Sequence, residues 1–174
     1  MANPTDLNAA KGDIARTAGL EVISRLNDAT GCSKGEIVHF DSNGLAVIAT
    51  ASGGNQQAGY AVALEAGTLS TASRFAIGNS YVHVLAGEAI VPFEAVDVDA
   101  TAGRAGSHTR PSDSALNLTV ANTTNMEADL DTAVDGIRDY FDKFVGRYIG
   151  HQTEIVGDPT DAADGDVIIV RLGL

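Results

Sequence analysis

The chain has 174 residues, a length that suits one domain or one domain with an arm. Hydrophobic residues make up 44% of it, enough for a core, but aromatics make up only 5%, so Ala, Val, Ile and Leu must build that core. The net charge of −12 disfavours nucleic acid as a direct partner, because binding it needs a basic surface. Residues 1–8 lack the pattern of a signal peptide, and no apolar run is long enough for a membrane span, so we expect no membrane partner.

The charged residues are unevenly distributed among types. The acids are mostly Asp, and the only lysines are Lys11, Lys34 and Lys143. Such a surface is typical of proteins from salt-loving organisms, because salt shortens the Debye length to about 3 Å at 1 M and makes self-repulsion tolerable. The alternative is an ordinary acidic protein from a low-salt environment.

Residues 1–19 are small, polar and punctuated by glycine, which predicts an N-terminal arm. Residues 20–174 are expected to form a single β-barrel-like domain. Residues 20–26 suit a strand or a short helix, 68–79 have no clear pattern, and 101–114, rich in Gly, Ser and Asp, are expected to form a loop. Asn43-Gly44 predicts a tight hairpin turn, since both positions tolerate a positive φ. The strands expected around and after that turn are 34–40, 45–50, 59–64, 81–85, 89–93, 95–98, 115–120, 148–156 and 167–170.

A short pattern of glycine, acid and apolar run recurs three times, at Gly35, at Gly87 and at Gly165. The third copy leads into the β-branched run 167–170, which is typical of a buried strand. We expect this strand to pair with 148–156 across the Asp-rich loop between them. The fold class that follows is mainly β: a small barrel or sandwich of short antiparallel strands with one inserted helix.

The inserted helix is expected at about 125–146. Its apolar residues are spaced by four, three, four and three positions, which is a helical seam, and Gly146 is suited to end it. This seam can pack on the protein's own sheet or form an oligomer contact where helices meet at a symmetry axis. The residues of the seam are Leu130, Val134, Ile137, Phe141 and Phe144.

The residues that could carry chemistry do not form a recognisable site. There is no phosphate-binding loop, and the four histidines lack the spacing of metal ligands. His39, His83 and His151 lie in strand patterns, at positions expected to face solvent. The Asp residues of 158–166 lack the spacing of a calcium loop and favour a polar turn. Cys32 has only Lys34 as a nearby cation, which is weak support for a reactive thiol. We therefore expect no cofactor, no metal and no enzymatic activity.

The order of the short motifs resembles that of head decoration (cement) proteins of tailed viruses. The motifs are Lys34-Gly35-Glu36-Ile37-Val38, Ala58-Gly59-Tyr60-Ala61-Val62-Ala63, Val82-His83-Val84-Leu85-Ala86-Gly87, Tyr148-Ile149-Gly150-His151 and Asp164-Gly165-Asp166-Val167-Ile168-Ile169-Val170-Arg171-Leu172. The inserted helix departs from the smallest members of that family, and His151 stands where a smaller residue is common. The acidic composition would suit a virus of a halophilic archaeon.

The resemblance implies a structural, non-enzymatic virion protein. Such proteins bind the outer capsid surface as homo-oligomers, commonly homotrimers, bridge subunits of the major capsid protein, and are assembled in the host cytoplasm. The alternative is a carbohydrate-binding or host-cell adhesion module on the virion. That alternative needs exposed aromatic rings, and the chain has only four Tyr and five Phe.

Overall fold

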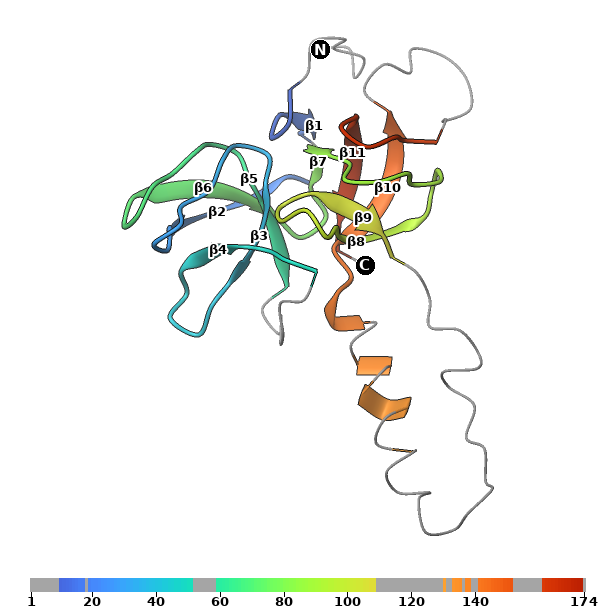
Figure 1. Cartoon of the computed structure of the whole chain (residues 1–174). Coiled ribbons are helices and arrows are strands. Elements are labelled where there is room, and N and C mark those ends of the chain that lie inside the picture. The colour runs from blue at the N-terminus through green and yellow to red at the C-terminus, as the bar shows by residue number, and fades with distance from the viewer. Residues whose placement is uncertain are drawn as a thin grey trace.

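A computed structural model of the chain contains two antiparallel β-sheets and one short helix (Figure 1). It describes residues 10–17, 19–51, 59–108, 130, 133–135, 137–138, 141–151 and 161–173. The six-stranded sheet has the order β1-β7-β11-β10-β8-β9, and the five-stranded sheet has the order β2-β6-β5-β3-β4. The mainly β prediction is confirmed. Over these residues the strands form two sheets and no closed barrel, so the barrel, one of the two expected forms, is not observed.

All the strands are short. They are β1 (Ile14–Arg16), β2 (Glu21–Leu26), β3 (Ile37–Phe40), β4 (Ala46–Ile48), β5 (Tyr60–Ala63), β6 (Ala72–Ile77), β7 (Tyr81–Leu85), β8 (Ala95–Val98), β9 (Ala105–Ser107), β10 (Gly146–His151) and β11 (Val167–Leu172). The described helical residues are 130, 133–135, 137–138 and 141–142. In Figure 1 they extend away from both sheets. Within the described residues, no helix has the length and hydropathy that a membrane crossing requires.

The main core lies between the two sheets. Val84 of β7, Ile168 of β11 and Val62 of β5 belong to one buried cluster, so both sheets contribute to it. The five-stranded sheet also has a second apolar cluster, in which Ala61 and Phe75 are fully buried. Because successive residues of β5 enter different clusters, this strand is covered on both faces. This explains why its sequence is apolar throughout and does not alternate.

The strand β11 lies inside the six-stranded sheet, between β7 and β10. Its pairing with β10 is the one expected from the sequence, and Tyr148 stands opposite Val170. Its side chains alternate, so that Ile168, Val170 and Leu172 are buried and the residues between them are half-buried. The hairpin at Asn43-Gly44 is confirmed as well, since β3 and β4 pair on either side of it.

Several local predictions are wrong. Gly146 does not end the helix: it begins β10, where its bare Cα lies against the carbonyl of Arg171. Residues 91–93 are not a strand, because Glu94 N–H donates to the carbonyl of Val91 and closes a turn. His83 does not face solvent: its ring is buried, with Nδ1 3.1 Å from the carbonyl oxygen of Asp13.

The six-stranded sheet begins inside the segment that was expected to be an arm. Ile14 and Arg16 of β1 pair with Val82 and Tyr81 of β7. Lys34 Nζ forms an ion pair with Asp13, which ties this segment to the turn before β3. Strand β6 lies in a region without a clear sequence pattern. Strand β9 lies in the segment that was expected to be a loop, and that prediction is wrong at 105–107, which pair with β8. The expected strand 115–120 and residues 1–9 lie outside the described residues.

Candidate interaction surface

The described helix presents a row of exposed apolar side chains, which we call the helix stripe: Leu130, Val134, Ile137 and Phe141. Their exposed fractions are 50%, 45%, 45% and 61%. These are the first four residues of the seam expected from the sequence. The alternative in which the seam packs on its own sheet therefore fails for these four. An apolar row that the chain itself leaves in water is typical of a protein contact surface.

The fifth residue of the seam, Phe144, differs from the other four because it is half-buried. Its ring meets the ring of His108 edge to face, with centroids 5.9 Å apart. His108 Nδ1 lies 3.3 Å from a carboxylate oxygen of Asp97 in β8. The next residue, Val145, is buried and its N–H donates to the carbonyl of Val96. The C-terminal end of the helix is thus attached to β8, while the stripe projects beyond it.

A groove of about 750 Å³ opens at the base of the stripe. Ile23, Phe40 and Ile77 of the five-stranded sheet line one side of it, and Phe141 and Phe144 line the other. The first three also pack against the second core cluster, so the floor of the groove is continuous with the core. Phe141 belongs both to the stripe and to the lining of the groove, so the two surfaces meet there. Residues more than 60 positions apart build the groove, which is why no local sequence pattern indicates it.

The rim of the groove carries few charges. Arg25 Nη1 donates to the carbonyl of Ser24, 3.0 Å away. The N–H of Leu45, 2.8 Å from Asp41 Oδ1, lowers the pKa of that carboxyl, which keeps it ionised. Tyr60 stays neutral, because burial raises its pKa to about 12. The groove therefore has an apolar floor with one cation and one anion at its edge, an arrangement suited to an apolar side chain of a partner.

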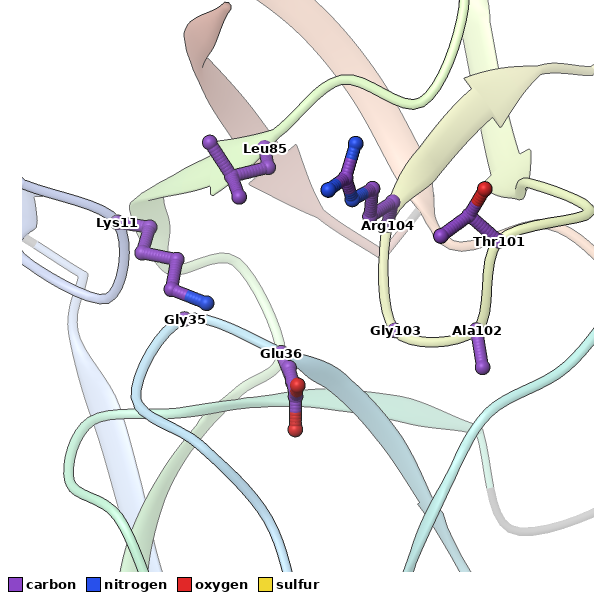
Figure 2. A pocket seen from close by; sticks show the side chains of 8 residues that line it. All are labelled: Lys11, Gly35, Glu36, Leu85, Thr101, Ala102, Gly103 and Arg104. Atoms are coloured by element: carbon purple, nitrogen blue, oxygen red, sulfur yellow. The ribbon is translucent and has the colours of Figure 1, made fainter. Parts of the chain in front are cut away.

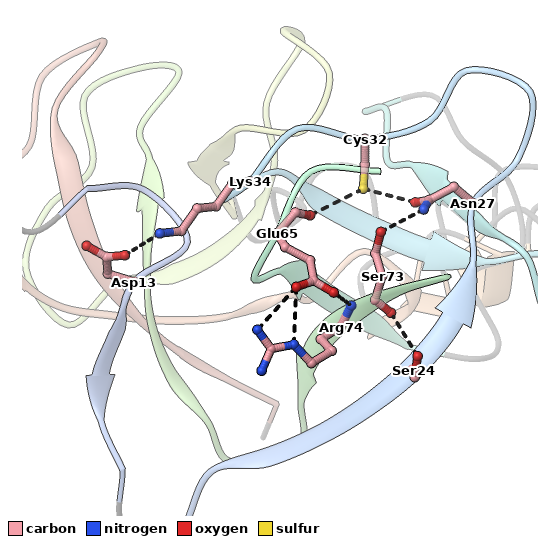
Figure 3. A network of polar contacts seen from close by, with 8 residues as sticks. All are labelled: Asp13, Ser24, Asn27, Cys32, Lys34, Glu65, Ser73 and Arg74. Carbon is pink, nitrogen blue, oxygen red and sulfur yellow. Dashed lines mark hydrogen bonds and ion pairs between the residues drawn. The ribbon is translucent and has the colours of Figure 1, made fainter. Parts of the chain in front are cut away.

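A buried polar network lies on the five-stranded sheet (Figure 3). Asn27 Nδ2 donates to Ser73 Oγ at 2.8 Å, and Cys32 Sγ lies 3.0 Å from Asn27 Oδ1. Burial raises the pKa of the Cys32 thiol, which disfavours the thiolate that a nucleophile needs. Each of these three side chains has a hydrogen-bond partner within the network, and all three are buried. The network thus stabilises the fold, and the thiol is unsuited to catalysis.

A second, smaller pocket of about 190 Å³ lies where the N-terminal segment meets the β8–β9 hairpin (Figure 2). Lys11, Glu36 and Arg104 provide its charged groups. Arg104 Nη1 forms an ion pair with Asp164 Oδ1 at 3.0 Å, and Glu36 Oε2 accepts the N–H of Ser33. Carboxylates compensate the cations, so the pocket has no strong excess of charge with which to hold an anion.

The residues considered as metal ligands are dispersed. No group of three or more His, Cys, Asp or Glu in the described part of the chain could hold an ion. Asp166 Oδ2 accepts the N–H of Ala163, and Asp166 N–H donates to the carbonyl of Ala163. For 161–166, the polar turn expected from the sequence is therefore confirmed. Asp158 and the side chain of His151 lie outside the described residues.

Comparison with known proteins identifies no family. The chain matches no protein-family model, and no curated protein is similar enough to count as a relative. The assignment of a function therefore depends on the surface itself, together with the order of the sequence motifs.

Proposed function

We propose that this protein is a structural virion protein that binds the outer capsid surface of a tailed virus as a homo-oligomer. Its role there is to stabilise the lattice of the major capsid protein. The observation that carries the proposal is the helix stripe, four large apolar side chains left in water on a helix that leaves an all-β body. The order of the sequence motifs, which resembles that of decoration proteins, supports the choice of a capsid as the partner.

The stripe suits contact between copies of the chain. Its spacing of three and four residues is that of helices that meet along a seam, and a symmetric oligomer buries the same face of every copy. A homotrimer around three such helices leaves the two sheets free to face the capsid. Three attached copies also bind a repeating surface more tightly than one, because each contact raises the local concentration for the next.

The net charge of −12 bears on the conditions for assembly. Copies of an acidic chain repel one another, and salt screens this repulsion. For the virus of a halophilic archaeon, high salt would be the native medium. We therefore expect the oligomer to be more stable at molar salt than at 50 mM salt.

The test uses Ile137→Asp, which places a charge in the middle of the stripe. Arg138→Asp is the matched control: it introduces the same side chain one residue away and changes the net charge more, yet spares the stripe. We expect the wild type and the control to sediment as oligomers and to co-sediment with shells assembled from the major capsid protein of the same virus. Ile137→Asp should be monomeric and bind shells at least about 100-fold more weakly. A monomeric wild type that does not bind shells would reject the proposal.

A second candidate is a virion module for carbohydrate or host-cell adhesion. The observation in its favour is Phe141, whose ring is exposed at a groove that also contains Arg25 and Asp41. Sugars stack on exposed aromatic rings, accept hydrogen bonds from cations such as Arg25 and donate them to carboxylates such as Asp41. A glycan array is the direct test: a signal that Phe141→Ala abolishes would favour adhesion, and an array without signal would remove this candidate.

A further inference from the structure

The loop between β7 and β8 presents two exposed apolar side chains on a tight turn, Val91–Glu94. The side chains of Val91 and Phe93 are each 56% exposed, and we call this pair the apolar knob. Glu94 N–H donates to the carbonyl of Val91 at 3.1 Å, which closes the turn. Pro92 occupies the second position and Phe93 the third, where φ is +63°. This is the pattern of a type II turn.

Phenylalanine is an unfavourable choice at that third position. A type II turn requires a positive φ there, and glycine is the usual residue because a Cβ meets the backbone in this conformation. In the described part of the chain, Phe93 and Ser70 are the non-glycine residues with positive φ, and Phe93 is by far the larger. Strained positions of this kind concentrate at binding and catalytic sites.

The strained conformation is held firmly on all sides. Phe93 N–H donates to the carbonyl of Tyr148, and Arg147 Nη1 donates to the carbonyl of Phe93, at 3.1 and 3.2 Å. Val91 N–H donates to Glu94 Oε2 at 3.1 Å. Ile90, just before the turn, is fully buried and exchanges backbone hydrogen bonds with Ala162. The knob is thus fixed in place before any partner arrives.

The fold gains little from the two side chains of the knob, because more than half of each is in water. A glycine would give the same turn without strain, and a polar residue at 91 would be better hydrated. A rigid apolar projection does serve binding, since a pre-ordered side chain loses little entropy when it enters a pocket. Aromatic side chains that fill a partner's pocket are frequent centres of binding energy.

The size of the knob indicates what kind of partner it binds. A fully buried aromatic side chain covers about 150–250 Å², whereas a stable complex in solution buries about 800 Å² on each partner. One knob is therefore too small to hold two free molecules together. It becomes effective when many copies are attached side by side to a repeating surface, where weak contacts add up.

We propose that the apolar knob inserts into an apolar pocket that recurs across the capsid lattice, once for each attached copy. This inference rests on the proposed function. It assigns the contact between copies of this chain to the helix stripe, and the contact with the capsid shell to the apolar knob.

The experiment compares Phe93→Gly with the wild type, with Ser70→Gly as the matched control. The control relieves a positive φ in another turn and leaves the knob intact. The measurements are thermal unfolding, sedimentation of the free protein, and titration onto shells assembled from the major capsid protein of the same virus. Phe93→Gly should unfold at a temperature no lower than the wild type and keep its oligomeric state, but bind shells at least about tenfold more weakly. Ser70→Gly should bind as the wild type does.

Each contrary outcome has its own meaning. Wild-type protein that does not bind shells would overturn the proposed function, and this inference with it. Equal binding by the wild type and Phe93→Gly would overturn the knob while the proposed function stands. A marked loss of thermal stability in Phe93→Gly would show that Phe93 serves the fold, which would overturn the inference as well.

Discussion

Ile168 of β11 and Ile137 of the helix are the same residue type, and each lies on the apolar face of its element, yet their surroundings are opposite. Ile168 is fully buried, whereas Ile137 is 45% exposed. Strand β11 has a hydrogen-bonded neighbour on each side and the core beneath it. The helix is attached through Phe144 and Val145 at its C-terminal end. Apolar spacing thus determines the kind of element, while the neighbours of that element determine whether the chain covers its apolar face.

The substitution Ile168→Asp should have the largest effect on the fold. It places a carboxylate without a partner between the two sheets, at a cost of several kcal/mol out of a total stability of about 5–15 kcal/mol. We expect no soluble folded protein, measured as the yield of soluble chain and the far-ultraviolet circular dichroism of any that remains. A well-folded variant would show that β11 is peripheral to the core.

The same substitution in the helix tests whether an exposed isoleucine tolerates the charge that a buried isoleucine does not. Ile137→Asp should leave the thermal unfolding of the β body within about 0.5 kcal/mol of the wild type, because an exposed position tolerates charge. The variant should differ in its oligomeric state and in its binding to shells. If Ile137→Asp lowers the soluble yield as much as Ile168→Asp does, then the stripe is covered by the chain itself.

A smaller effect is expected from Gly146→Ala, at the start of β10. The added Cβ would collide with the carbonyl oxygen of Arg171, in backbone that cannot easily move, at about 1–3 kcal/mol. Gly165→Ala is the control: no atom lies within 4 Å of the added Cβ, but φ is +85°, so about 1 kcal/mol of strain is expected. Chemical denaturation should rank Gly146→Ala below Gly165→Ala in stability. The reverse order would contradict the close approach at β10.

The smallest effect is a dependence on pH through His39. Burial lowers the pKa of this imidazole from its usual 6.5, so the unfolded chain takes up the proton first as the pH falls. The contribution of His39 to stability is therefore lost progressively below pH 6.5. Unfolding free energies at about pH 8 and pH 5.5 should differ less in His39→Gln than in the wild type. Equal differences would show that His39 is not responsible.

Features that depend on neighbouring residues in the chain were predictable from the sequence. Asn43-Gly44 predicted the β3–β4 hairpin because a tight turn needs residues that accept a positive φ. The β-branched run at 167–170 predicted a buried strand, and its expected pairing with the preceding strand, β10, is confirmed. The helical spacing from Leu130 to Phe141 predicted an element that the described helical residues confirm.

Features that depend on distant residues were not predictable in this way. Val91-Pro92-Phe93 has the composition of an interrupted strand. Long-range hydrogen bonds, from Phe93 to Tyr148 and from Arg147 to Phe93, help to hold it as a turn. His83 alternates like a solvent-facing residue, but the N-terminal segment covers it. Strand β6 carries small and polar residues, and its position between β2 and β5 makes it a strand.

A mainly β protein with one helix and an acidic composition was thus predictable from the amino acids alone, because turn chemistry, apolar spacing and charge are local properties. Which apolar residues stay in water was not predictable in this way. Burial depends on which strands lie on either side of a segment, and that is set by contacts between residues far apart in the chain. The helix stripe and the apolar knob are the surfaces that those contacts leave exposed.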